Sequence, residues 1–545
     1  MTPADTSIRG RSPTLIRAIA TVGGLTMLSR IAGFVRDILT AAMLGAGVVA
    51  DAFFVALKLP NLFRRLFAEG AFSVSFVPMF SADLESKGID PAVAFAERAL
   101  AVMIAVLLPL TILAVIAMPA IMTVIAPGFV DDAERFDLAV TLGRVTFPYL
   151  ILMSLVALMG GVLNALGRYG PFAAAPILFN LCLIAALLLA EPLIGWGIVA
   201  TVGHALAWAV LIAGIVQLLW LAEACRRAGV RLGLPRPRID ARIRKLFRLM
   251  APGALGAGVI QINIFIDILL ASLLPAGAIS YLYYADRLYQ LPLGVIGIAI
   301  GTALLPMLSR QVEAADTSAA LRTQNRALDA ALLLSIPSAV ALIVIPQPIL
   351  TVLFQRGAFD AEATRATALA LAAYGIGIPA YVMVKVFSTV YFARQDTASP
   401  VKVAIVATVM NISLSLILIR YLGHVGLALA TGLTAWLHVA ILVRGLRRRG
   451  LFRLDAETRR RILGQIAAGA VLGIALLATA LLTGLGSWLP LGDEAGARTA
   501  SGLWAGPIGL MALVAMGAAT YFAAGALFGG VRLSDVKRLI WKKAA

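Results

Sequence analysis

The chain has 545 residues, of which 61% are hydrophobic and only 14% are charged, and this composition excludes a soluble multidomain protein. The net charge of +18 does not indicate nucleic acid binding, because the lysines and arginines gather in short segments between apolar runs. The two cysteines and three histidines lack metal-ligand spacing, so we expect no disulfide, no metal site and no cofactor.

Apolar runs alternate with short polar connections along the whole chain. Residues 1–14 are polar, and we interpret the run after them as a retained first span, because Arg30 interrupts it and no small-residue cleavage motif follows. Windows long enough to cross about 30 Å of hydrocarbon then recur. They predict an all-α polytopic membrane protein with about fourteen transmembrane helices, near 16–47, 49–80, 93–125, 137–165, 171–190, 194–224, 245–273, 279–308, 328–353, 364–392, 400–420, 423–445, 462–488 and 502–529.

Basic residues are distributed unequally between the two sets of alternate connections. Nine lie between 226 and 248 and eight between 444 and 461, both on the side that also carries the two termini. The opposite connections hold five, namely Arg135, Arg356, Arg365, Arg420 and Arg498. Because cytoplasmic connections carry the excess of Lys and Arg, we expect both termini to be cytoplasmic.

The two most basic connections also divide the chain. We expect a cytoplasmic tail at 1–14, a first six-helix lobe at 15–230, a second six-helix lobe at 231–450, a C-terminal helix pair at 451–530 and a basic cytoplasmic tail at 531–545. The lobes resemble each other weakly, since VPMFS at 77–81, Pro148, Pro171 and Asn180 recur at a nearly constant offset as LPMLS at 305–309, Pro379, Pro400 and Asn411. A six-span repeat keeps its orientation, so a substrate would bind between the lobes.

Charged residues interrupt the apolar run of residues 51–70, DAFFVALKLPNLFRRLFAEG. On a helix, Asp51, Lys58 and Arg65 project in nearly the same direction because they are seven residues apart. Asn61, Leu62 and Glu69 lie beside that line, and Arg64 adds a further cation. The preceding helix carries Arg30, Arg36 and Asp37. Charges at membrane depth are expensive, so they face a water-filled cavity or a partner and mark a substrate path.

Two structural alternatives to a substrate role remain open for these charges. Long side chains near a helix end can reach water, but a rise of about 1.5 Å per residue places Lys58 roughly 12 Å and Arg65 roughly 22 Å into a core of about 30 Å. Arg65 and Glu69 could instead form an internal pair at i, i+4. The excess of positive charge in the cluster favours the substrate role.

A second charged position lies in YLYYADRLYQLPLG at 281–294, where Asp286 and Arg287 stand among tyrosines. It can be an aromatic belt near the membrane interface with a local ion pair, or a gate and counterpart to the first cluster. The chain has no G-x-x-x-x-G-K-[ST] phosphate loop and no Cys or His cluster. The sequence therefore does not indicate ATP hydrolysis.

Several motifs together resemble one family. They are SRIAGFVRD, ADAFFVALKLPNLFRRLFAEGAFS, TFPY at 146–149, YYADRL at 283–288, GTALLPMLS at 301–309 and ARQDTASPVK at 393–402. To about residue 450 the chain is similar to the MurJ (MviN) lipid II flippases of the multidrug/oligosaccharidyl-lipid/polysaccharide (MOP) exporter superfamily. The resemblance implies two lobes around a V-shaped central cavity plus an extra helix pair, and no enzymatic activity. It also implies alternating-access flipping of the peptidoglycan precursor from the cytoplasmic to the periplasmic leaflet of the bacterial inner membrane, in support of cell wall biogenesis and cell shape.

The resemblance also implies which residues act. The family's functional residues carry over onto Arg30, Arg36, Asp51, Lys58, Asn61, Arg64, Arg65, Glu69, Asp286 and Arg287. The implied partners are lipid II, which is an undecaprenyl-diphosphate-linked muropeptide, and membrane lipids, with cell-wall synthesis proteins beside them. We expect a monomer and no catalytic residue.

Two other function classes compete with this interpretation. An exporter of small cationic drugs would favour acidic and aromatic cavity walls, which the surplus of arginine disfavours, whereas an exporter of another lipid-linked oligosaccharide would share the basic site. A membrane-embedded glycosyltransferase needs a carboxylate or His as base, or an aspartate-held metal. Its candidates, Asp37, Asp51 and Asp286, each have a cation nearby.

Overall fold

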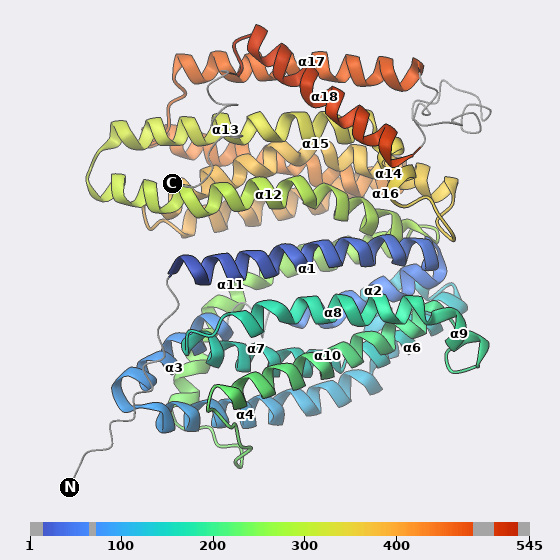
Figure 1. The fold of residues 1–545 in the computed structure, drawn as a ribbon, viewed down its shortest axis with the longest axis vertical. Helices are drawn as coiled ribbons and strands as arrows, with labels where there is room; N and C mark the ends of the chain where they lie inside the picture. Colours follow the sequence, from blue (N-terminus) through green and yellow to red (C-terminus); the bar gives the residue numbers. More distant parts are fainter. Residues whose placement is uncertain (1–14, 65–71, 483–505, 532–545) are drawn as a thin grey trace. The chain divides into compact units, whose positions relative to one another are not determined.

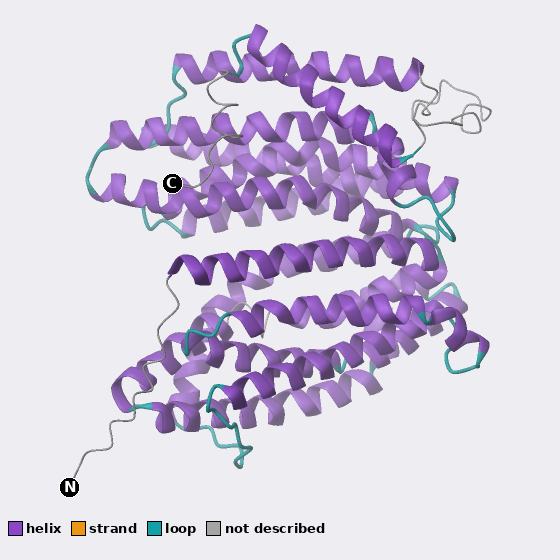
Figure 2. Ribbon diagram, viewed as in Figure 1, coloured by secondary structure: helices purple, strands orange, loops and turns teal. Residues whose placement is uncertain are grey.

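The computed structural model describes residues 15–64, 72–482 and 506–531. In these ranges the regular structure is entirely helical (Figure 1), and loops and turns join the helices (Figure 2). The predicted all-α fold class is therefore confirmed. The predicted tails at 1–14 and 531–545, except for Val531, lie outside the described residues.

The chain divides into two compact units, Met1–Leu273 and Leu274–Ala545. The predicted lobe boundary between residues 230 and 231 would assign the helix of residues 241–272 to the second half, whereas that helix packs within the first unit. The first unit contains α1 (Leu15–Leu44), α2 (Val48–Arg64), α3 (Ser73–Lys87), α4 (Ile89–Ile116), α5 (Met118–Ile125), the 3-10 turn η2 (Pro127–Phe129), α6 (Ala133–Thr146), α7 (Tyr149–Ala165), α8 (Gly170–Leu188), α9 (Ala190–Gly195), α10 (Val202–Arg227) and α11 (Ala241–Ser272).

The second unit contains fewer but longer helices. Its C-terminal pair packs on the helix of residues 317–344 through a core that includes Leu472, Leu476 and the buried ring of Tyr521. The helices are α12 (Ala278–Glu313), α13 (Thr317–Val344), α14 (Pro346–Leu353), α15 (Ala361–Phe392), α16 (Ala398–Arg448), α17 (Ala456–Leu482) and α18 (Pro507–Leu527).

Nine spans among the described residues are long and apolar enough to cross a membrane. Each of the fourteen predicted windows overlaps at least one described helix, but the count of fourteen spans stays a prediction. The long helices α1, α11 and α12 are not among the nine, and all three carry charged residues within their length. The nine spans are Ile89–Ile116, Ala133–Ala165, Gly170–Leu188, Val202–Arg227, Thr317–Val344, Ala361–Phe392, Ala398–Arg448, Ala456–Ala480 and Pro507–Leu527.

The order of helices repeats along the chain. The helices α4, α5, α6 and α8 begin at Ile89, Met118, Ala133 and Gly170, and α13, α14, α15 and α16 begin 228 positions later, at Thr317, Pro346, Ala361 and Ala398. The caps repeat too, because Asp132 and Asp360 each accept a hydrogen bond from the backbone N–H three residues ahead. This register supports the predicted duplication. By the same spacing α11 is the counterpart of α1, because its last residue, Ser272, lies 228 positions after Leu44, the last residue of α1.

A single glycine bends α16 into two sections. Gly423 has φ 54° and ψ −131°, a conformation that side chains with a Cβ rarely adopt. The bend separates the two predicted spans at 400–420 and 423–445. Asn411 in the first section donates to the Thr431 hydroxyl in the second at 3.4 Å, so the two sections pack against each other.

We expect Gly423→Ala to lower the melting temperature of the purified protein, because the alanine would hold a strained backbone at a cost of about 1–3 kcal/mol. Gly473→Ala is the matched control. Gly473 lies inside helix α17, where a Cβ would meet Val340 at an ordinary 3.5 Å. Thermal unfolding in detergent would measure both variants, and equal melting temperatures would contradict the assigned role of Gly423.

Candidate functional site

Arg36 is held in a fixed position on α1. Its Nη2 and Nε donate to Asp37 Oδ1 at 2.6 and 3.1 Å, and its Nη1 donates to Asn180 Oδ1 on α8 at 2.8 Å. Asn180 is itself oriented, because its Nδ2 donates to the Ser29 carbonyl at 3.0 Å. The Arg36 side chain remains 12% exposed. The guanidinium is thus preorganised on a side chain that is not fully buried, which suits contact with an anionic ligand.

Arg30 lies on a different face of α1. Its side chain is exposed within the first unit, and so are those of Met27, Ile31 and Val35 around it. A cation among exposed apolar side chains cannot be stable against lipid alone. This position therefore requires water, a counter-charge or an anionic ligand.

Asp51 is buried completely. Arg135 of α6 donates from its Nη2 to Asp51 Oδ2 at 2.7 Å, and the exposed fractions of the two side chains are 4% and 0%. The Arg135 guanidinium also lies 3.9 Å from the centroid of the Phe129 ring. Thr146 of α6 adds a hydrogen bond to the Ala56 carbonyl of α2 at 3.0 Å. The pair therefore joins α2 to α6, and no part of the Asp51 carboxylate is open to a substrate.

The second half of α2 is less buried than the first. Lys58, Asn61 and Arg64 are partly exposed, whereas residues 51–57 are buried. Asn61 donates to the Leu57 carbonyl at 2.8 Å, and Arg64 Nε donates to Asn61 Oδ1 at 3.2 Å. Of the residues expected on one line, Asp51 is thus in the interior and Lys58 is partly exposed. Arg65 and Glu69 lie outside the described residues.

Arg64 also lines a cavity of about 370 Å³ within the first unit. The cavity has a mixed wall, with polar side chains from α1, α2, α7, α10 and the residue before α8, and apolar side chains from α1, α7 and α8. Its polar members are Thr26, Ser29, Arg64, Asn164, Tyr169 and Gln217. This space places the charged end of α2 beside hydrogen-bonding groups, which is the composition expected of a site for a polar ligand.

Asp286 and Arg287 are half-buried on α12 of the second unit. Gln290 donates to the Asp286 carboxylate, and the Arg287 guanidinium lies 4.7 Å from the centroid of the Tyr283 ring. Tyr289, on the same helix, stacks on Tyr374 with a centroid distance of 5.1 Å. The aromatic environment expected from the sequence is therefore present around both charges.

Two residues of these networks, Arg135 and Asn180, and a further cation, Lys385, have no role in the sequence-based prediction. Arg135 was counted among the connections, and Asn180 served only as a landmark of the repeat. Lys385 of α15 is exposed, and its ammonium lies so close to Gly297 that a Cβ there would collide with Nζ. The partners of Asp51 and Arg36 lie 84 and 144 positions away, so spacing within one helix could not reveal them.

The motif ARQDTASPVK at 393–402 has a structural role just after the end of α15. Asp396 of ARQDTASPVK accepts hydrogen bonds from the Ser399 hydroxyl at 2.6 Å and the Ser399 backbone N–H at 2.9 Å, and from Arg449 at 2.7 Å. These hydrogen bonds, of which those from Ser399 have the largest effect, lower the pKa of Asp396 to about 2. The carboxylate is thus ionised at neutral pH and joins the two ends of α16.

The described residues contain no group of three or more His, Cys, Asp or Glu side chains that could hold a metal ion. Cations outnumber carboxylates on α1 and α2, where Asp37 and Asp51 are each paired with an arginine. Arginine and lysine bind anions rather than cations. The arrangement is therefore suited to recognising phosphate or carboxylate groups.

Comparison with known proteins identifies relatives along nearly the whole chain. A family model described as "Lipid II flippase MurJ" matches residues 40–492. A protein of Rhizobium tropici named "Probable lipid II flippase MurJ" is 42% identical over 537 residues, which is 97% of each chain. A protein of Vibrio cholerae with the same name is 36% identical and covers 96% of this chain and 98% of its own length.

Solved structures share the fold. A structure described as "Lipid II flippase MurJ, inward closed conformation" aligns with a TM-score of 0.74 at 25% identity, over 93% of this chain and 98% of its own. A MATE-family multidrug transporter of the MOP superfamily in an inward-facing conformation aligns with a TM-score of 0.64 at 16% identity, over 80% of this chain and 98% of its own. The MATE likeness concerns the fold alone.

We expect Asp51→Ala to reduce folded protein in the membrane, because leaving one partner of a buried ion pair uncompensated costs about 3–5 kcal/mol. The double variant Asp51→Leu with Arg135→Met should restore both folding and function, since an apolar pair of similar size avoids the desolvation of two charges. Membrane yield and complementation of a depleted strain would be measured together. A double variant that folds at the wild-type level yet fails to complement would contradict the purely structural role of Asp51. It would indicate that Asp51 contacts the substrate.

Proposed function

The chain belongs to the MurJ lipid II flippase family, and we propose that the cations of α1 and of the accessible half of α2 bind the anionic head group of lipid II during its translocation. The function is that of a multi-pass inner-membrane transporter for a cell-wall precursor, not of an enzyme. The observation that carries it is the family match over most of the chain, together with the full-length similarity to proteins named as lipid II flippases.

The chemistry of the substrate fits the described side chains. Lipid II carries a diphosphate, two sugars and a peptide with carboxylates, and these groups require cations and hydrogen-bond donors. Arginine offers planar, bidentate contacts to phosphate. Arg36 has its guanidinium fixed by Asp37 and Asn180, so it loses little conformational entropy on binding. Lys58 and Arg64 add charge that is partly exposed, and the polyprenyl tail can remain in lipid.

We also propose which residues form the site, how the protein is oriented in the membrane and which proteins it acts beside. We assign Arg30, Arg36, Lys58, Asn61, Arg64, Arg65 and Glu69 to the head-group site and Asp286 with Arg287 to a counterpart in the second half, while Asp51 supports α2. Flipping runs from the cytoplasmic to the periplasmic leaflet by alternating access between the lobes at 15–230 and 231–450, with both termini cytoplasmic. The protein acts as a monomer beside cell-wall synthesis proteins.

We expect Arg36→Ala to reduce lipid II flipping by about tenfold to a hundredfold, the effect of losing one or two charge-assisted hydrogen bonds. Arg36→Lys should restore little, because an ammonium cannot reproduce the contacts to Asp37 and Asn180 and still present a bidentate fork. Flipping would be measured in reconstituted vesicles by the accessibility of labelled lipid II.

Arg322→Ala is the matched control for charge removal, because Arg322 is exposed on α13 of the second unit. It should flip lipid II at the wild-type rate. The proposal would be refuted by wild-type flipping of Arg36→Ala at equal protein density.

We also expect flipping to depend on membrane potential. An inside-negative potential favours the outward movement of a net negative head group. The gain in free energy is about 2.3 kcal/mol per charge per 100 mV. If the bound cations neutralise the head group, the empty positive site is instead drawn back inward, and turnover still depends on voltage. Potassium-diffusion potentials in vesicles at constant pH and sodium would test this, and a rate indifferent to their size and sign would point to an ion gradient.

A further inference from the structure

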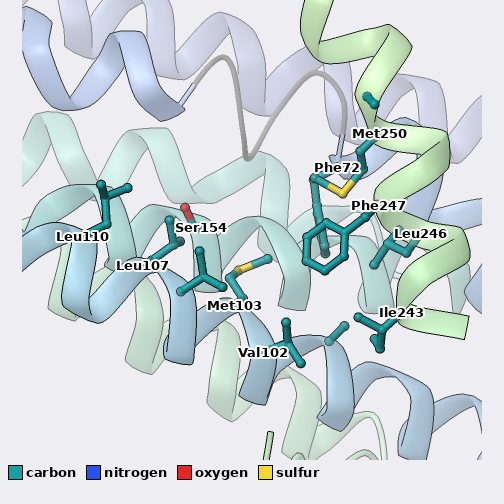
Figure 3. A pocket seen from close by; sticks show the side chains of 13 residues that line it. Phe72, Val102, Met103, Leu107, Leu110, Ser154, Ile243, Leu246, Phe247 and Met250 are labelled. Carbon is teal, nitrogen blue, oxygen red and sulfur yellow. The ribbon is translucent and has the colours of Figure 1, made fainter. Parts of the chain in front are cut away.

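An apolar groove of about 280 Å³ lies between α4 and α11 in the first unit. Figure 3 shows Val102, Met103 and Leu107 of α4 facing Phe247 and Met250 of α11 across this space. None of the lining residues belongs to the cationic cluster of α1 and α2. The groove is therefore separate from the proposed head-group site.

The wall of the groove is suited to hydrocarbon. Ser154 is the one lining residue with a polar side chain, and its hydroxyl donates to the Leu150 carbonyl of its own helix at 2.8 Å. A space without free polar groups does not hold ordered water, and apolar cavities of this kind bind apolar ligands. An aliphatic chain can fill this groove without leaving any polar side chain of its lining unpaired.

The groove opens on a surface that a membrane covers. At its mouth the exposed fractions are 54% for Val106 and 43% for Phe247. Helix α4 is one of the nine candidate spans, so Val106 faces the hydrocarbon of the bilayer. A lipid chain can enter from the side without crossing a polar layer.

Helix α11 is fixed near both ends. Arg242 forms an ion pair with Asp83 of α3 near the first end, and at the last residue the Ser272 hydroxyl accepts a hydrogen bond from the Gly128 backbone N–H at 3.2 Å. Gly128 permits this approach, since a Cβ there would collide with the Ser272 carbonyl. The groove is thus a space between two helices that other contacts hold in place.

Three exposed cations lie beside the groove on the same helix, namely Arg244, Lys245 and Arg248. Arg244 and Arg248 are one turn apart, and on the helix they flank Phe247 and Ala251, which line the groove. Within the described part of the chain these three side chains have no ion pair, whereas the nearby Asp240 is paired with Arg98. They belong to the basic connection that the charge asymmetry places on the cytoplasmic side.

We propose that this groove binds an anionic phospholipid of the cytoplasmic leaflet, with one acyl chain between α4 and α11 and the phosphate on Arg244 and Arg248. The apolar wall selects a hydrocarbon chain, and the adjacent cations select a negative head group. Basic sites between membrane helices on the cytoplasmic side bind anionic lipids by this combination of forces. The lipid stabilises the packing of α11 on α4.

The test uses the full-length protein, purified in detergent with equal amounts of phosphatidylglycerol and phosphatidylcholine of the same chains and of undecaprenyl phosphate. Retained lipid is quantified by mass spectrometry after detergent exchange. Val106→Trp blocks the mouth of the groove. Its matched control is Leu113→Trp on the same helix, because Leu113 is 62% exposed and does not line the groove. Arg244→Gln with Arg248→Gln removes the phosphate site, and Arg459→Gln with Arg460→Gln is its control.

We expect the wild type and both controls to retain phosphatidylglycerol over phosphatidylcholine. Val106→Trp should retain about tenfold less phosphatidylglycerol, and the Arg244, Arg248 double variant should lose the preference for the anionic lipid. Equal retention by Val106→Trp and Leu113→Trp would overturn the groove as the site. Retention of undecaprenyl phosphate in place of phosphatidylglycerol by the wild type would also overturn the proposal and assign the groove to a prenyl tail.

Discussion

A charge within a hydrocarbon core is stable only where a counter-charge, hydrogen bonds or water compensate it, and the first unit depends on this constraint. Asp51 and Arg135 meet it by pairing completely, with both side chains removed from solvent. Arg36 meets it with Asp37 and Asn180, and 12% of its side chain stays exposed. An arginine and an aspartate therefore form a fully buried pair that joins α2 to α6, whereas on α1 the same two residue types leave a cation that can meet a ligand.

This difference in burial separates charges that only join helices from charges that can reach a ligand more clearly than residue type does. Because α2 is buried along residues 51–57, its first half can only join neighbouring helices. Its second half carries Lys58 and Arg64, which are partly exposed, and Arg64 lines a cavity with polar and apolar walls. A carrier needs both a buried half and an exposed half in such a helix. The binding site opens to each side of the membrane in turn, and the helices that hold it must keep their packing while it does so. Asp396, with its pKa lowered to about 2, has the same kind of supporting role at the end of α15.

Apolar runs and their length were sufficient to predict the helices, because the bilayer sets how long an apolar segment must be. Every predicted span overlaps a described helix, and the repeat predicted from a few landmarks agrees with helix starts 228 positions apart. The sequence also located the cations of α1 and α2. It could not distinguish the roles of Asp51 and Arg36, because Arg135 and Asn180 lie far along the chain and meet them only through packing. Nor could it predict that α11 packs within the first unit, since contacts between helices decide that.

We propose that Arg36, held by Asp37 and Asn180, binds the diphosphate of the substrate. The most direct test is the affinity of wild type and Arg36→Ala for lipid II and for an analogue in which an uncharged linker replaces the diphosphate. The two changes form a cycle that isolates the contact between the residue and the group. We predict that Arg36→Ala weakens lipid II binding by about tenfold or more and leaves analogue binding unchanged. An equal loss for both ligands would contradict a direct contact between Arg36 and the diphosphate.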